Sequence, residues 1–198
     1  MAKDDYDLAG FGVGVADKSR LIDGHDIVSG DIILGLAASG LHANGFSMVR
    51  KVFDIADVKK LEQPVAKLGM TLGKALLRPT RIYVKPILNL HKQNLLKGVA
   101  HITGGGIGEN LARSLPVGFD ALIDQSSWET SPIFELIQER GDIDESEMRR
   151  TFNLGIGMMV IVAANKVEDA CKILETTGET VYQCGRIVTG KGEVGFSG

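Results

Sequence analysis

Three consecutive glycines, Gly104 to Gly106, separate an apolar stretch from a helix-like segment in the sequence HITGGGIGEN. Because glycine has no side chain, such a run can turn several backbone amides toward one point. The start of the following helix adds unsatisfied N–H groups and the positive end of a dipole. The pattern predicts that these three amides converge on a phosphate group. A glycine connection that binds no ligand is the alternative interpretation.

A second helix start carries polar side chains, in the sequence SGLHANGFS. His42 and Asn44 precede the predicted helix, and Ser47 lies in its first turn. An imidazole, an amide and a hydroxyl group at an electropositive helix end favour a polar ligand. In the alternative interpretation, Asn44 only caps the helix and His42 is a loop histidine satisfied by its neighbours.

Arg81 and Tyr83 alternate in TRIYV, which we expect to be extended and to be followed by a helix that begins at Pro86. Side chains two residues apart in extended backbone project from the same face. A guanidinium group there would suit a phosphate or a carboxylate. A surface salt bridge accounts for Arg81 equally well.

Other apparent motifs fail on their chemistry. The segment GRIVTGKG has P-loop spacing, but Gly192 stands where that motif needs serine or threonine, so we expect a surface turn. The two cysteines, Cys171 and Cys184, have no zinc-ligand spacing. Neither a disulfide framework nor a metal site is therefore expected.

The composition is that of a globular protein. The 198 residues include 44% hydrophobic and 24% charged residues, which favours one large folded domain. A net charge of -3 and an aromatic content of 6% argue against nucleic acid as a partner. No apolar run is long enough to cross a membrane, and the acidic start MAKDDYDL lacks a signal-peptide core, so we expect a cytoplasmic protein.

Hydrophobic periodicity and turn signals predict the elements that would position these residues. In the first half we expect paired extended segments at 9–24, a buried strand at 32–36, a helix that Asn44 caps, a helix pair within 57–78, and strand, glycine loop and helix around 98–115. In the second half we expect a strand near 120–129, helices at 132–140 and 144–151, a strand at 155–163, a helix from Asn165 and a strand at 180–188. The result is a single α and β domain.

Five blocks of the sequence together resemble one enzyme family: YDLAGFGVGV, SGLHANGFSMVRK, PTRIYVKPIL, AHITGGGIGENLAR and TFNLGIGMMVIV. They occur in the same order as in the aminoimidazole ribonucleotide synthetases, also called phosphoribosylformylglycinamidine cyclo-ligases. The resemblance implies the fold of the C-terminal domain of that superfamily. This is an α+β fold in α/β/α layers, with a mixed sheet that is partly ferredoxin-like.

The resemblance also implies what lies outside this sequence. Residues 1–28 would be a strand segment that joins an upstream ATP-binding domain, and residues 29–198 would form the substrate-binding domain. The implied reaction uses ATP and Mg²⁺, bound mainly by that upstream domain, to close formylglycinamidine ribonucleotide into aminoimidazole ribonucleotide. The full-length protein would be a homodimer, and this chain alone would be inactive.

By the same resemblance, several residues acquire roles. Gly104, Gly105, Gly106 and Asn110 would form a half-site for the ribose phosphate of the substrate, and Asn44 would face the cleft between the domains. Ser47 and Arg81 are added to the predicted substrate-binding residues from their chemistry and positions alone. His42 is the candidate catalytic residue, and Ala43 departs from the serine that the family often carries.

Two other classes of function stay open. One is another ATP-using member of the superfamily, such as formylglycinamidine ribonucleotide synthetase, selenophosphate synthetase or thiamine-monophosphate kinase. The other is a non-catalytic module that binds a phosphate ligand.

Overall fold

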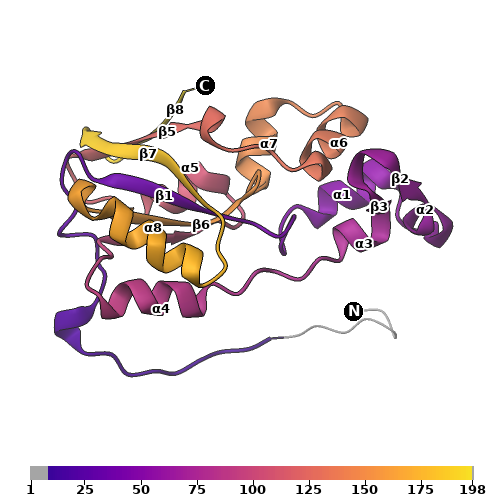
Figure 1. The fold of residues 1–198 in the computed structure, drawn as a ribbon. Coiled ribbons are helices and arrows are strands. Elements are labelled where there is room, and N and C mark those ends of the chain that lie inside the picture. The colour runs from indigo at the N-terminus through magenta and orange to yellow at the C-terminus, as the bar shows by residue number, and fades with distance from the viewer. Residues whose placement is uncertain (1–8, 198) are drawn as a thin grey trace.

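A computed structural model describes residues 9–197, which form a six-stranded mixed sheet with helices on both faces (Figure 1). The strands of this sheet are β1 (Ile32–Ala37), β4 (Gly98–His101), β5 (Phe119–Asp124), β6 (Ile156–Val162), β7 (Val181–Thr189) and β8 (Val194–Ser197). They lie in the order β4-β6-β1-β7-β5-β8. All neighbours are antiparallel except β5 and β8, which are parallel. The expected mixed sheet is confirmed.

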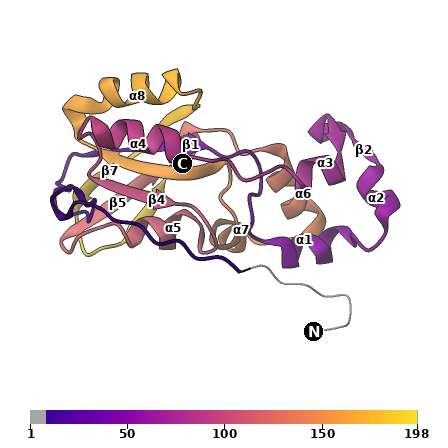
Figure 2. The ribbon, with the colours of Figure 1, turned by 90° about the horizontal axis from the view of Figure 1, so that it is seen from below.

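Alternation along the strands divides the apolar side chains between two layers of helices. Leu34 and Val160 face α4 (Val84–Lys92) and α8 (Val167–Thr176), whereas Ile33 and Ile161 face α5 (Gly106–Ala112). Seen from below, α4 and α8 lie on one side of the sheet and α5 on the other (Figure 2). This arrangement confirms the expected α/β/α layers.

A group of short helices extends beyond one end of the sheet (Figures 1 and 2). It comprises α1 (Phe46–Phe53), α2 (Val58–Glu62), α3 (Leu72–Leu76), α6 (Pro132–Gly141) and α7 (Glu145–Thr151). Its core includes Val49, Phe53, Phe134 and Phe152, all buried. The helix pair expected within 57–78 is confirmed. Its two helices are separated by a short hairpin that the sequence did not indicate, in which the two-residue strands β2 (Pro64–Val65) and β3 (Met70–Thr71) pair.

The paired extended segments expected at 9–24 are wrong for the described part of the chain. Only a 3-10 turn, η1 (Lys18–Arg20), occurs there. Phe11, Val13 and Val15 are almost fully exposed, because this arm runs along the outside of the molecule past α4 (Figure 1). The strand segment predicted for 1–28 therefore has no strand over residues 9–28, and it stays a prediction for residues 1–8, which lie outside the described range.

Two helix starts differ from their expected positions. Helix α4 begins at Val84 instead of Pro86, so Val84 is not extended. The turn η4 (Ala164–Lys166) precedes α8, so Lys166 rather than Asn165 is the N-cap residue. Helix α7 begins where the sequence predicts, with Asp144 as its N-cap residue, although the Asp144 side chain makes no capping hydrogen bond. Among the described residues, none of the helices has the length and apolar composition that a membrane span requires.

Candidate functional site

The glycine loop lies where the sequence places it, between the end of β4 and the start of α5. Gly105 and Gly106 have φ angles of 96° and 62°, in the left-handed region that favours glycine. A β-carbon on Gly106 would collide with the carbonyl oxygen of Arg149. The loop therefore needs glycine at this position because it packs closely against the end of α7.

Two of the three loop amides are already bonded within the protein. The Gly105 amide donates to the Arg150 carbonyl at 2.9 Å, and the Gly106 amide donates to the Thr103 carbonyl at 3.0 Å. Within residues 9–197 the Gly104 amide has no such acceptor. The prediction that all three amides converge on a phosphate is therefore wrong for Gly105 and Gly106. A phosphate would have only the Gly104 amide of the three.

Asn110 holds the loop from inside. Its side-chain amide donates to the carbonyl oxygens of Gly106 at 2.7 Å and Gly104 at 3.2 Å, and its side-chain oxygen accepts from the Thr103 hydroxyl at 3.2 Å. Asn110 is buried, at 7% exposure. These contacts orient its polar atoms toward the loop, so Asn110 shapes the loop in this structure.

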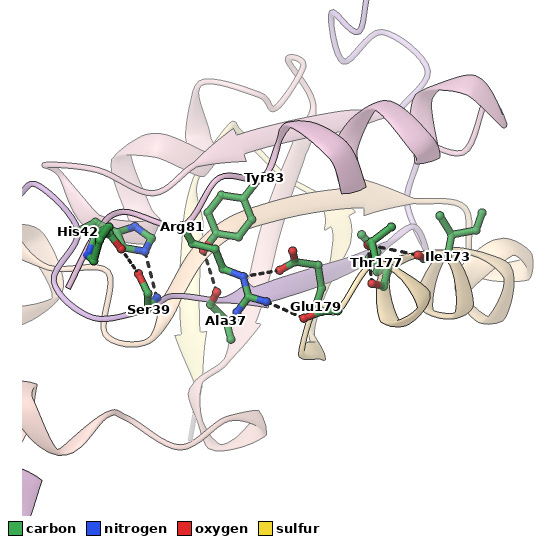
Figure 3. Close-up of polar contacts among 11 residues, drawn as sticks. Ala37, Ser39, His42, Arg81, Tyr83, Ile173, Thr177 and Glu179 are labelled. Atoms are coloured by element: carbon green, nitrogen blue, oxygen red, sulfur yellow. Dashed lines mark hydrogen bonds and ion pairs between the residues drawn. The ribbon is translucent and has the colours of Figure 1, made fainter. Parts of the chain in front are cut away.

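The second polar loop, between β1 and α1, is built around His42. This residue has a φ of 58°, an unusual value outside glycine that histidine tolerates better than most residues. The Ser39 amide donates to the His42 Nε2 atom at 3.1 Å (Figure 3). Burial lowers the pKa of His42, and the positive charges of His101 and Arg81 lower it further. The ring is therefore neutral near pH 7.

Tyr83 and Gly157 form the walls around that imidazole, a role that sequence reasoning missed. The Tyr83 ring centroid lies 6.2 Å from that of His42, and the Tyr83 hydroxyl donates to the Ala37 carbonyl at 2.8 Å (Figure 3). A β-carbon on Gly157 would lie 2.5 Å from the His42 Cε1 atom and would also collide with the Tyr83 hydroxyl. Gly157, the second glycine of GIGMMV, thus makes room for both rings.

Arg81 is paired within the protein, as the salt-bridge interpretation expected. Its Nε atom lies 2.9 Å from the Glu179 Oε2 atom, and its Nη2 atom donates to the Gly178 carbonyl at 2.6 Å (Figure 3). Burial raises the pKa of Glu179, and the charge of Arg81 opposes that rise. Residues 79–83 form an irregular segment before α4 rather than a strand.

Asn44 approaches the glycine loop instead of capping α1. The N-cap residue is Gly45, in the left-handed conformation with a φ of 77°, and no side chain caps the helix. The Asn44 Oδ1 atom lies 3.7 Å from the position of a β-carbon on Gly104. Ser47 is exposed in the first turn of α1. The fold therefore brings the two predicted loops together through Asn44 and Gly104.

A groove of about 600 Å³ adjoins the same loop on the outer side of α5. Gly105 and Gly108 line it together with Arg149, Arg150 and Phe196. The Arg149 guanidinium lies over the Phe196 ring at 5.6 Å. Each arginine also pairs with a glutamate of α7. Glu109 and Glu193 also line the groove, so its lining carries charges of both signs. The sequence pattern did not indicate the arginines because they come from a helix far along the chain.

The apparent P-loop is a turn whose amides bind a carboxylate of the protein. The amides of Lys191, Gly192 and Glu193 donate to the Asp120 Oδ1 atom at 2.6 to 2.9 Å. These bonds lower the pKa of Asp120. Within residues 9–197, no group of three or more histidine, cysteine, aspartate or glutamate side chains is placed to hold a metal ion.

Comparison with known proteins adds the family. The model of the C-terminal domain of AIR synthase related proteins matches residues 28–197. The chain is 52% identical to the phosphoribosylformylglycinamidine cyclo-ligase of Methylobacillus flagellatus, covering 96% of this chain and 54% of the relative. Identity to the protein of the same name from Caldicellulosiruptor bescii is 49%, covering 96% and 56%. The chain spans about half the length of the curated relatives it matches.

Solved structures support the same fold. A thiamine-monophosphate kinase from Stenotrophomonas maltophilia has a TM-score of 0.61 at 16% identity, covering 92% of this chain and 55% of its own. A PurL protein of Thermotoga maritima, complexed with AMPPCP, has a TM-score of 0.53 at 13% identity, covering 89% and 24%. At such identities the likeness concerns the fold alone. The match over residues 28–197 shows that the chain belongs to the AIR synthase related proteins, through their C-terminal domain.

Proposed function

We propose that the chain is the substrate-binding half of a phosphoribosylformylglycinamidine cyclo-ligase. The observation that carries this proposal is its identity of about half to relatives with that name, sustained over nearly the whole chain. The reaction would be the ATP-dependent closure of formylglycinamidine ribonucleotide to aminoimidazole ribonucleotide, a step of purine biosynthesis. Identity at this level favours the cyclo-ligase over the superfamily members that share only the fold.

The substrate phosphate would bind where the two loops meet. Gly104 offers an amide without a protein acceptor, and Asn44 offers a side-chain amide beside it. Gly105, Gly106 and Asn110 would contribute by fixing the shape of the loop. A hydrogen bond to a charged group contributes about 1.5–3 kcal/mol, so two aligned donors give useful affinity.

The remaining predicted contacts would lie on either side of that junction. Ser47 presents its hydroxyl from the first turn of α1, and Arg81 stands near His42 behind the loop. Arg149 and Arg150 line the neighbouring groove, where their guanidinium groups would donate to an anionic substrate in competition with the glutamates beside them. The chain's own part in catalysis would be to bind and orient the substrate.

ATP and Mg²⁺ would be bound mainly by the part of the protein that precedes this chain. The described residues do not supply a carboxylate cluster for Mg²⁺, so they do not fit that ion on their own. ATP would phosphorylate the amide oxygen of the substrate and so turn it into a good leaving group. We also propose that the full-length protein is a cytoplasmic homodimer.

A chimeric enzyme tests the proposal. The part of the Methylobacillus flagellatus relative that this chain does not cover would be joined to this chain, and ADP release would be measured with formylglycinamidine ribonucleotide. We expect substrate-dependent ADP release and rescue of a purine auxotroph lacking the cyclo-ligase. The matched control is the same relative with its own C-terminal half removed, which should be inactive.

The contradicting result is a folded chimera that binds ATP but neither releases ADP with this substrate nor rescues growth. Rescue of a strain lacking a different superfamily enzyme would transfer the assignment to that enzyme. A chimera that binds ATP but does not react has a correctly joined ATP-binding half, so the substrate assignment is wrong. A chimera that does not bind ATP has a failed junction between its two halves.

A further inference from the structure

We infer that His42 is a positioning residue, which acts through Asn44 instead of touching the substrate. Its ring accepts the Ser39 amide, and this bond holds the loop of residues 39–45 in the conformation that faces the glycine loop. The inference depends on the proposed function only for the identity of the ligand. It differs from the expectation that His42 is catalytic.

The bond between Ser39 and His42 fixes the tautomer of the ring. The Nε2 atom accepts from the Ser39 amide at 3.1 Å, so this nitrogen carries the lone pair and the proton is on Nδ1. The side chain is 5% exposed, and its Nδ1 atom is shielded from solvent. A shielded ring whose basic nitrogen is occupied by the main chain is poorly placed to accept a substrate proton.

The ring cannot easily take another position, because three elements surround it. Tyr83 precedes α4 and packs against the ring, while its hydroxyl is bound to the Ala37 carbonyl at the end of β1. Gly157 of β6 leaves only enough space for the imidazole and the phenol. The close-up shows His42 beside Ser39, with Tyr83 and Ala37 nearby (Figure 3).

The rest of the loop is attached at both ends, but Asn44 is not. The Ser39 hydroxyl donates to the Pro79 carbonyl at 2.6 Å, and the Asn153 side chain donates to the Gly40 carbonyl at 2.9 Å. Gly45 packs against the Phe152 ring. Within residues 9–197 no hydrogen bond holds the Asn44 side chain, so its place beside the glycine loop depends on the backbone that His42 supports.

The charges around the ring oppose its protonation. Arg81 and His101 place positive charge toward it, and Tyr83 contributes an uncharged phenol. A protonated ring would carry hydrogen on both nitrogens, so it would also lose the bond from the Ser39 amide. The neutral form of His42 is thus the form that supports the loop.

The first experiment reads the tautomer by NMR. Two-bond ¹H–¹⁵N correlation of the histidine-labelled chain distinguishes a proton on Nδ1 from one on Nε2. In a titration from about pH 8 to about pH 6, we expect His42 to be neutral with its proton on Nδ1 at pH 7 and to become charged at a lower pH than His25. The exposed His25 is the internal control, because Asp23 raises its pKa and it should become charged in this range. A proton on Nε2 of His42 would overturn the inference.

The second experiment compares two variants at this position. His42→Gln places an amide oxygen near the position of Nε2, where it can accept the Ser39 amide, whereas His42→Leu removes the acceptor. Both replacements meet the same left-handed backbone, so they differ in the acceptor alone. In His42→Leu we expect shifted amide signals of Asn44 and Gly104 and at least tenfold weaker binding of ribose 5-phosphate by calorimetry. His42→Gln should recover most of both readouts, and His25→Gln should change neither.

Unchanged signals and affinity in a folded His42→Leu protein would refute the positioning role. If His42→Leu does not fold, His42→Gln decides: native Asn44 and Gly104 signals support the inference, and displaced signals refute it. Failure of the wild-type chain to bind ribose 5-phosphate would count against the proposed substrate site alone. The amide signals need no ligand, so they still test the role of His42.

Discussion

The side-chain oxygen of Asn44 lies 3.7 Å from the point where a β-carbon on Gly104 would stand. One residue precedes α1 and the other follows β4, so the contact joins two loops that are distant in the sequence. Each loop alone offers a few polar groups, and a ligand at their junction would meet both. This contact is the structural basis of the proposed phosphate site.

Asn44→Asp should weaken phosphate binding strongly. The change puts a carboxylate beside the one loop amide that has no protein acceptor, so it replaces a donor with a negative charge. We expect at least a tenfold loss of affinity for ribose 5-phosphate in calorimetry. Asn165→Asp introduces the same charge at an exposed turn and serves as the control. Equal affinities in the two variants would place the phosphate elsewhere.

Alanine substitutions should separate the roles of Gly106 and Gly104. A β-carbon on Gly106 meets the Arg149 carbonyl in a left-handed backbone, so Gly106→Ala should destabilise the protein by about 1–3 kcal/mol. Gly104 is exposed and has only the Asn44 side chain nearby, so Gly104→Ala should cost less than about 0.5 kcal/mol. Urea denaturation measures both. Similar losses in the two variants would contradict the distinction.

The sequence allowed the elements around the glycine loop to be predicted, but not the contacts of that loop. Local signals are enough to identify β4, the three glycines and α5, because each depends on neighbouring residues. The Gly105 amide, however, bonds to the Arg150 carbonyl, which comes from another helix. A pattern of residues contains no information on such a distant partner, so it could not show which amides are already occupied.

The dependence on partners that are distant in the sequence also explains other differences between the predicted and the observed structure. Strand β8 was not predicted because its ladder depends on a parallel pairing with β5, which lies far away in the sequence. The clustering of His42, Tyr83 and Gly157 likewise requires the sheet to be assembled first. At Val84 a helix replaces the extended backbone that its β-branched side chain favours. Val84 itself is exposed, and α4 packs on the sheet through Pro86 and Leu90 instead.

Breaking the pair of Arg81 and Glu179 should reduce stability. Glu179 is buried, at 8% exposure, and its ion pair with Arg81 offsets part of the cost of burying its charge. Arg81→Met should lower the free energy of unfolding by about 1–3 kcal/mol, and adding Glu179→Gln should restore part of it. Lys60→Met, which breaks an exposed pair with Asp54, should cause no measurable loss. If the double variant is no more stable than Arg81→Met, the loss of stability in Arg81→Met does not come from the broken ion pair.

Asp120 should make stability depend on pH in the acid range. Three backbone amides hold its folded-state pKa below the ordinary value of an aspartate, so the ionised form stabilises the fold. This stabilisation is present above the unfolded-state pKa and is lost as the pH falls through the folded-state value. The Tm of the wild type should therefore fall more steeply than that of Asp120→Asn between about pH 4.5 and 2.5. Parallel curves would contradict the assignment, and Asp142→Asn is an exposed control that should follow the wild type.

Asn110→Asp tests whether this residue serves the loop or the ligand. The buried amide donates to the carbonyls of Gly104 and Gly106, and a carboxylate in its place would face those oxygens without a proton to share. We expect a loss of about 2–4 kcal/mol in urea denaturation and faster hydrogen exchange at the Gly105 and Gly106 amides. Asn165→Asp at an exposed site should show neither effect.

The alternative outcome for Asn110→Asp is equally informative. Native stability and exchange, combined with lost affinity for ribose 5-phosphate, would mean that the side chain turns outward to the ligand and that the loop holds its shape without it. Lost stability together with lost affinity is the result that the structure favours, because a loop without its internal donor cannot keep the Gly104 amide aimed at the junction with Asn44.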